Sequence, residues 1–196
     1  MFRPFVRVPI LLAACVVSSV SCSERSPIAP TGQDAGGLQS GPSQNLSTQP
    51  DRPIKGDCTT TITFIDADTA GQCAAFEPVP SVYIAIGGTC TISHLGRTEL
   101  SAVQQLILMP DASGQLVVTE LRNCSTFTAA NGDRLLHTTA GAVEPAGGAD
   151  VAFSGSMTFA GGTGRFAGAS GTATFRGTAS LATNTGAFSF DGIVVY

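Results

Sequence analysis

Few side chains in this sequence can do acid–base chemistry, and they do not form a known catalytic arrangement. His94 and His137 are the only two histidines. Each lies in a predicted strand, without an acidic or cysteine partner at a fixed spacing. A hydrolytic triad would also need a nucleophile on a sharp strand-to-helix turn, and no such motif is present. We therefore predict no catalytic residue, and for both histidines a structural hydrogen bond to strand backbone.

The densest polar cluster on one stretch of chain is His94, Arg97 and Glu99. Imidazole, guanidinium and carboxylate groups can each bond to a polar group of a small molecule. They are the ligand-binding candidates of the sequence, should the mouth of a β-barrel hold a polar ligand.

Metal binding finds little support in the sequence. Asp66 and Asp68 lie two residues apart in a predicted turn, but the further oxygen ligands of a calcium loop are missing. Zinc sites commonly show paired Cys or His at short spacings, and neither pairing occurs here. We predict that the two aspartates are turn residues and that the protein binds no metal and no cofactor.

The first residues of the chain have the pattern of an export signal. Arg3 and Arg7 form a short basic start, and residues 8–20 are largely apolar but too few to span a bilayer. A cysteine that follows such a run can be the lipid-bearing residue of a bacterial lipoprotein. Cys15 has the better local motif, whereas Cys22 leaves a longer apolar run and is followed at once by polar residues. We favour Cys22, with Cys15 as the alternative, and an ordinary secretory signal without lipid stays open.

Residues 23–57 have the composition of a flexible linker. They are rich in Pro, Ser, Gln and Gly, and their apolar residues are isolated, so they bury too little to offset chain entropy. The predicted organisation is a signal peptide at 1–21, an anchor cysteine and disordered linker at 22–57, and one folded domain at 58–196. The expected location is the cell envelope, periplasmic or surface-exposed and held by the lipid, with secretion as the alternative.

Four further cysteines lie in the predicted domain: Cys58, Cys73, Cys90 and Cys124. An exported compartment permits disulfides, and four cysteines allow three pairings. We predict two disulfides, and of the three arrangements we favour Cys58–Cys73 with Cys90–Cys124.

The domain alternates between small and bulky side chains with a period of two residues. The alternation is clearest in residues 151–196, where turns of Gly and Asn separate the runs. The run 103–109 is apolar on nearly every position, and we predict it as a strand because it ends at Pro110. Residues 81–86 form a further predicted strand, which we expect to stop at Gly87 and Gly88.

Short alternating strands with turns every 8–12 residues are typical of a sandwich or barrel. Small residues alternating with large ones suit the tight interior of a small barrel, and glycine within strands permits the bending that closure needs. The predicted fold class is all-β, an antiparallel up-and-down β-barrel of about eight strands. A barrel of that size either fills itself with side chains or holds one small ligand.

Three glycine-rich motifs, at residues 87–97, 128–133 and 161–171, resemble a group of small exported bacterial proteins of unknown function. The last of them also resembles the glycine-rich turn of the allene oxide cyclase and dirigent families. This resemblance covers roughly residues 80–196 and implies a calycin-like barrel. Enzymes of those families guide cyclisation or coupling of reactive ligands inside the barrel. Their polar active-site residues find no match here, so the resemblance carries over no catalytic role.

The charge of the chain limits its partners. Fourteen acidic residues face ten basic ones, which gives no basic footprint for nucleic acid. The expected partners are a membrane, through the lipid anchor, and a small apolar ligand; the sequence does not set the oligomeric state. We expect a non-enzymatic envelope protein that binds a small apolar molecule or an envelope partner. The alternatives are an enzyme that steers a reactive ligand inside the barrel and a structural module with a filled barrel.

Overall fold

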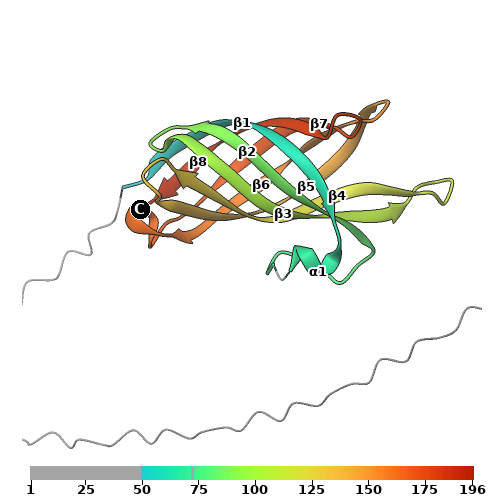
Figure 1. The fold of residues 1–196 in the computed structure, drawn as a ribbon, viewed down its shortest axis with the longest axis horizontal. Coiled ribbons are helices and arrows are strands. Elements are labelled where there is room, and N and C mark those ends of the chain that lie inside the picture. The colour runs from blue at the N-terminus through green and yellow to red at the C-terminus, as the bar shows by residue number, and fades with distance from the viewer. Residues whose placement is uncertain (1–49, 72) are drawn as a thin grey trace, which may run out of the picture. The chain divides into compact units, whose positions relative to one another are not determined.

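The computed structural model describes residues 50–71 and 73–196. These residues form a closed antiparallel barrel in which each strand pairs with its neighbours in sequence and the first strand pairs with the last (Figure 1). The predicted lipid-bearing residues Cys15 and Cys22, and the signal peptide, lie outside the described residues. The strands are β1 (Arg52–Ile65), β2 (Ser81–Ile92), β3 (Gly96–Pro110), β4 (Leu116–Ala129), β5 (Arg134–Gly147), β6 (Asp150–Gly162), β7 (Ser170–Ser180) and β8 (Thr185–Val195). The predicted up-and-down barrel of about eight strands is confirmed, and a calycin-like barrel is consistent with it.

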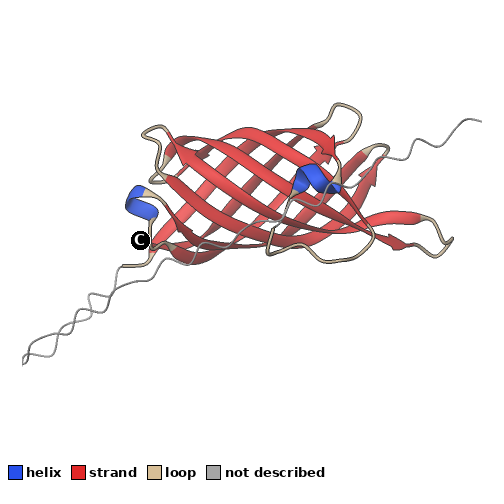
Figure 2. Cartoon of the chain, turned by 60° about the horizontal axis from the view of Figure 1, so that its bottom comes forward, coloured by secondary structure: helices blue, strands red, loops and turns tan. Residues whose placement is uncertain are grey.

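The strands cross the barrel axis diagonally, as Figure 2 shows, and the connections lie alternately at its two ends. We call one end the mouth; it carries the loops 66–80, 111–115, 148–149 and 181–184. The other, the packed end, carries the loops 93–95, 130–133 and 163–169 together with the start of β1 and the end of β8. A short helix, α1 (Ala67–Ala70), and a 3-10 helix, η1 (Gly164–Phe166), lie in these loops.

Barrel closure corrects the predicted domain boundary. The first half of β1, from Arg52 to Asp57, lies in the segment predicted as linker but pairs with β8, with Ile54 opposite Gly192 and Gly56 opposite Phe190. Ile54 is fully buried. An isolated apolar residue beside a proline gives no signal in the sequence, because the partner strand lies at the far end of the chain. The barrel therefore includes residues 52–57, which the sequence pattern places in the linker.

Glycine within strands permits the tight contacts of this barrel. The predicted stop at Gly87 and Gly88 is wrong, because β2 continues through both residues to Ile92. A Cβ at Gly88 would overlap the backbone oxygen of Thr59 on the neighbouring strand. Gly88 therefore lets β1 and β2 approach each other within the sheet. The predicted strand over 103–109 is confirmed as part of β3.

Two disulfides join the four cysteines of the described residues, but the favoured pairing is wrong. Cys58 bonds to Cys90, and Cys73 bonds to Cys124. Cys58 and Cys90 lie directly opposite each other on β1 and β2 and are buried in the core. Cys73 lies in the loop after α1 and ties it to β4. Sequence separation does not reveal these pairings, because strand register decides which cysteines meet.

The packed end is filled by large apolar side chains. Phe127 and Phe190 stack with ring centroids 5.5 Å apart, and Phe166 of η1 meets Tyr196 edge to face at 4.7 Å. Buried aromatic pairs of this kind add to the free energy of area burial. Side chains therefore close this end of the barrel, and any opening to the interior lies at the mouth. None of the helices in the described part of the chain is long and apolar enough to cross a membrane.

Candidate functional site

A cavity lies in the interior of the barrel, lined by side chains from all eight strands. The volume of the cavity, counted as the space that the centre of a water molecule can occupy, is about 90 Å³. One water molecule needs roughly 10–15 Å³ on this measure, so the cavity has room for a few waters or a compact organic molecule. Most of its wall is apolar: Ile62, Ile84, Ile86, Leu100, Ala102, Leu106, Val118, Leu121, Val143, Val151, Phe153, Met157, Phe175, Ala179, Leu181 and Phe188.

Polar side chains line one side of this cavity, on β3, β4 and β5. Strand register places them in two adjoining rows. Gln104 lies opposite Asn123, and Asn123 lies opposite Thr139. Ser125 lies opposite His137 in the next row. All five side chains are buried, so the sheet brings together in the core polar groups that are up to 35 residues apart in the sequence.

Hydrogen bonds join the first members of this group. Ser125 Oγ donates to Asn123 Oδ1 at 2.8 Å. The amide of Asn123 lies 3.5 Å from Gln104 Oε1, a long contact. The bonds do not extend to the other two side chains: within the described chain, His137 Nδ1 and Thr139 Oγ1 are buried without a hydrogen-bond partner. A buried polar atom without a hydrogen bond lowers the stability of the folded state by about 1–3 kcal/mol.

His137 is held between aromatic rings. Its imidazole stacks on Phe127 with centroids 4.3 Å apart and meets the edge of Phe159 at 6.1 Å. Burial lowers the pKa of His137 to about 3. The ring is therefore neutral at physiological pH, with one nitrogen that donates and one that accepts. It can bond to a hydroxyl or amide, but it offers no positive charge to a carboxylate.

The cavity wall, as formed by the described residues, contains no Asp, Glu, Lys or Arg. A charged group placed inside would lose its hydration without gaining a counter-ion, which costs far more than burying a neutral polar group. Nor does any group of three His, Cys, Asp or Glu side chains with metal-binding geometry occur in the described part of the chain. The arrangement fits an uncharged molecule that is mostly apolar and carries a single polar group.

The structure places the predicted ligand-binding residues elsewhere. His94, Arg97 and Glu99 are exposed near the packed end, and none of them lines the interior cavity. His94 lies in the turn between β2 and β3, where its Nε2 contacts the backbone oxygen of Pro53 at 3.0 Å. The predicted structural bond to backbone is thus confirmed for His94. The same prediction does not describe His137, whose Nδ1 has no partner in the described chain.

The sequence does contain a signal for the interior polar group. On β4, Asn123 and Ser125 share the inner face with the apolar residues Leu121 and Phe127. On β5, His137 and Thr139 share the inner face with Leu135. Polar residues that take the positions of an apolar face are candidates for a binding site in a small barrel. Arg97 and Glu99, the charged residues near Leu95, are exposed and do not line the cavity.

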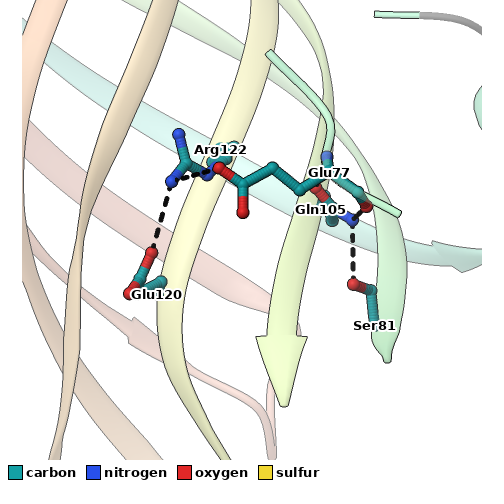
Figure 3. Close-up of polar contacts among 5 residues, drawn as sticks. All are labelled: Glu77, Ser81, Gln105, Glu120 and Arg122. Atoms are coloured by element: carbon teal, nitrogen blue, oxygen red, sulfur yellow. Dashed lines mark hydrogen bonds and ion pairs between the residues drawn. The ribbon is translucent and has the colours of Figure 1, made fainter. Parts of the chain in front are cut away.

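A loop segment covers the outer wall behind the polar group. We call residues 73–80 the strap. Gln105 is fully buried beneath it and donates to the Glu77 backbone oxygen at 2.6 Å and to Ser81 Oγ at 2.8 Å (Figure 3). Arg122 pairs with Glu77 at 2.7 Å and with Glu120 at 3.5 Å. These contacts, with the Cys73–Cys124 bond, hold the strap against β3 and β4.

Two wider hollows lie across β1, β2, β7 and β8, with volumes of about 770 and 840 Å³. Both are open to solvent and are bordered largely by short side chains, among them Thr59, Thr89 and Thr178. Within the described chain, the unpartnered His137 and Thr139 line the interior cavity and neither hollow. The interior is therefore the candidate site, although it is smaller.

Comparison of this chain with protein-family models, with curated proteins and with solved structures finds no match. The candidate site therefore rests on the geometry of this structure alone.

Proposed function

We propose that this protein is an exported, lipid-anchored barrel of the cell envelope that binds a small, mostly apolar molecule through one uncharged polar group. The observation that carries the proposal is the pair of unpartnered polar atoms in the cavity wall, His137 Nδ1 and Thr139 Oγ1. A ligand hydroxyl could bond to both, since a hydroxyl donates and accepts. The surrounding apolar wall would bury the rest of the ligand.

The proposed location is supported by the export pattern of residues 1–22 and by the two disulfides. Structural disulfides persist in oxidising compartments and are rare in the cytosol. The proposal keeps Cys22 as the lipid-bearing residue, with Cys15 as the alternative. Palmitate labelling of Cys22→Ala and Cys15→Ala variants tests it: loss of label in one variant identifies the anchor, and an unlabelled wild type contradicts lipidation.

A second candidate is a structural module whose barrel holds no ligand. The size of the cavity favours it, because about 90 Å³ is below the 300–1,000 Å³ of typical ligand pockets. An engineered cavity of about 150 Å³ binds benzene, so a ligand of the first proposal is compact, and a molecule with a single ring would leave part of its surface outside the cavity.

Nuclear magnetic resonance titration with benzyl alcohol separates these two functions. The matched probe is toluene, which has the same ring and no hydroxyl. We expect benzyl alcohol to shift the amide signals of residues lining the cavity and to bind about tenfold more tightly than toluene. This ratio corresponds to one net hydrogen bond to a buried group.

The matched variant is Thr139→Val, which keeps the shape of the side chain and removes its hydroxyl. It should reduce the preference for benzyl alcohol over toluene, whereas Thr172→Val on the outer face of β7 should not. Equal binding of the two probes by the wild type would contradict the role of His137 and Thr139. Absence of any shift on the cavity wall with either probe would overturn ligand binding and leave the structural module.

A further inference from the structure

The strap is held weakly apart from its disulfide. None of the residues 73–80 is buried. The Glu77 N–H donates to Gln105 Oε1 at 2.9 Å, and Gln105 Nε2 donates to the Glu77 backbone oxygen at 2.6 Å. Bonds to water can replace these bonds when the strap lifts, so each adds little net stability. The ion pair of the Glu77 side chain is partly exposed and also adds little, and one aromatic contact joins Phe76 to Tyr83. The covalent bond to β4 is therefore the main constraint on this segment.

The two disulfides differ in their access to solvent. Cys58 and Cys90 lie in the core with exposures of 3% and 2%. Cys73 and Cys124 lie on the outer wall, and both are partly exposed. A disulfide is reduced when a thiolate reaches one of its sulfurs, so exposed disulfides are reduced more easily than buried ones. A soluble thiol can therefore reach the strap disulfide in the native state, whereas reduction of Cys58–Cys90 needs opening of the barrel.

The strap lies behind the polar side of the cavity. Gln105 bonds to the strap on the outer wall, and the preceding residue, Gln104, lines the cavity. Cys124 bonds to the strap from β4, and the preceding residue, Asn123, also lines the cavity. The β3–β4 ladder is irregular two residues beyond Gln105, where Thr119 has no partner in the register. The strap thus supports the two strands that present Gln104 and Asn123 to the cavity, next to a point where their own pairing is interrupted.

We infer that Cys73–Cys124 is a redox latch that controls the candidate site. Reduction by a dithiol opens the latch while Cys58–Cys90 stays closed, and the strap then leaves β3 and β4. Without this support β4 is less firmly held, and with it Asn123, which lies opposite Thr139 in the cavity wall. The polar side of the cavity then binds a hydroxyl less strongly. The inference rests on the proposed function, because the latch regulates the same cavity.

The reduction is an ordinary thiol–disulfide exchange with the dithiol as the reductant. One thiolate of the dithiol attacks a sulfur of the Cys73–Cys124 bond, which breaks as a mixed disulfide forms, and the released cysteine thiolate takes up a proton. The second thiolate of the dithiol then attacks its own sulfur in the mixed disulfide and releases the other cysteine, which is protonated in turn. Two electrons and two protons pass to the protein, and the dithiol is oxidised to a disulfide.

The first test measures selective reduction in the full-length, oxidised protein. Dithiothreitol, a soluble dithiol, is added under native conditions, free thiols are alkylated with iodoacetamide, and mass spectrometry locates the label. We expect label on Cys73 and Cys124 at reductant concentrations that leave Cys58 and Cys90 unlabelled, and these two should react only in denaturant. Equal labelling of the two pairs, or no labelling of Cys73 and Cys124 without denaturant, would refute the latch.

The second test follows the strap after reduction. Amide hydrogen exchange of Glu77 reports on its bond to Gln105, and it should become at least about tenfold faster in the reduced protein while the amides of β7 stay protected. The variant Cys73→Ala with Cys124→Ala should exchange like the reduced wild type and should not respond to dithiothreitol. An unchanged rate at Glu77 would mean that the strap stays in place without its disulfide, which contradicts the latch.

The third test links the latch to the cavity. The preference for benzyl alcohol over toluene, expected to be about tenfold in the oxidised protein, should fall below about threefold after selective reduction. The protected amides of β7 show in the same samples that the barrel itself stays closed.

The outcomes separate this inference from the proposed function. If benzyl alcohol keeps the same preference over toluene in both redox states, control of the site is refuted while the ligand-binding function stands. If neither probe binds the oxidised protein, the proposed function fails and control of the site fails with it. The labelling and exchange results would still decide whether the strap is released by reduction.

Discussion

Acidification should destabilise this barrel through His137, and the size of the effect follows from the burial of its ring. The imidazole is 3% exposed, and burial lowers its pKa to about 3, whereas an unfolded chain has a histidine pKa of about 6.5. Between these two values the unfolded state binds a proton that the native state does not. The free energy of unfolding therefore falls as the pH falls through this window and is unaffected by His137 above about pH 6.5.

The expected loss between pH 7 and pH 5 is about 2 kcal/mol. This is the product of about 1.5 pH units below the unfolded pKa and about 1.4 kcal/mol per unit. Urea unfolding followed by far-ultraviolet circular dichroism, with the disulfides intact, measures it at the two pH values. The His137→Asn variant has no group that titrates there, so it should lose about 2 kcal/mol less than the wild type on acidification.

A spectroscopic control makes this prediction specific. In the folded wild type, the ring signals of His137 should not titrate between about pH 7 and pH 4 in nuclear magnetic resonance spectra. The reasoning is refuted if His137→Asn is as acid-sensitive as the wild type, or if the His137 ring titrates near pH 6.5 in the native state.

Two further predictions concern the stability of the fold. Gly155→Ala should lower the free energy of unfolding by about 1–3 kcal/mol, because the added Cβ would overlap the backbone oxygen of Ala140. The control is Gly168→Ala, which should change this free energy little because the space around its Cβ is open. Equal losses for the two variants in urea unfolding would contradict the packing argument. Cys73→Ala with Cys124→Ala opens a loop closed over a separation of 51 residues, for which chain entropy predicts a loss of about 4 kcal/mol. A loss below about 1 kcal/mol in the same assay would show that the strap is held by its other contacts.

The sequence was sufficient for the architecture because strand periodicity is a local property. In residues 151–196, small and bulky side chains alternate over a few positions at a time, and Val151, Phe153, Met157 and Phe159 face the interior as their spacing indicated. The hairpin turns are equally local, since Asn131 and Gly132 turn the chain between β4 and β5.

The first half of β1 could not be predicted from its own residues. Nothing in residues 52–57 is distinctive, and most of their backbone partners lie on β8, about 140 positions later. The sequence alone therefore assigned this half-strand to the linker. The same limit explains the wrong disulfide pairing, since the register of β1 against β2 places Cys58 opposite Cys90.

The amino-acid sequence by itself determined the all-β class, the up-and-down order of the strands and the four cysteines that form disulfides, because each of these depends on residue type or on neighbours a few positions away. The tertiary structure alone decided where the barrel closes, which cysteines pair and which polar residues meet. Gln104, Asn123 and His137 are ordinary strand residues in the sequence, and they become one buried polar group only when the register of β3, β4 and β5 sets them side by side. The physical reason is that strand pairing joins residues far apart in the chain, so the surroundings of a side chain in a barrel are fixed by partners that no local pattern specifies.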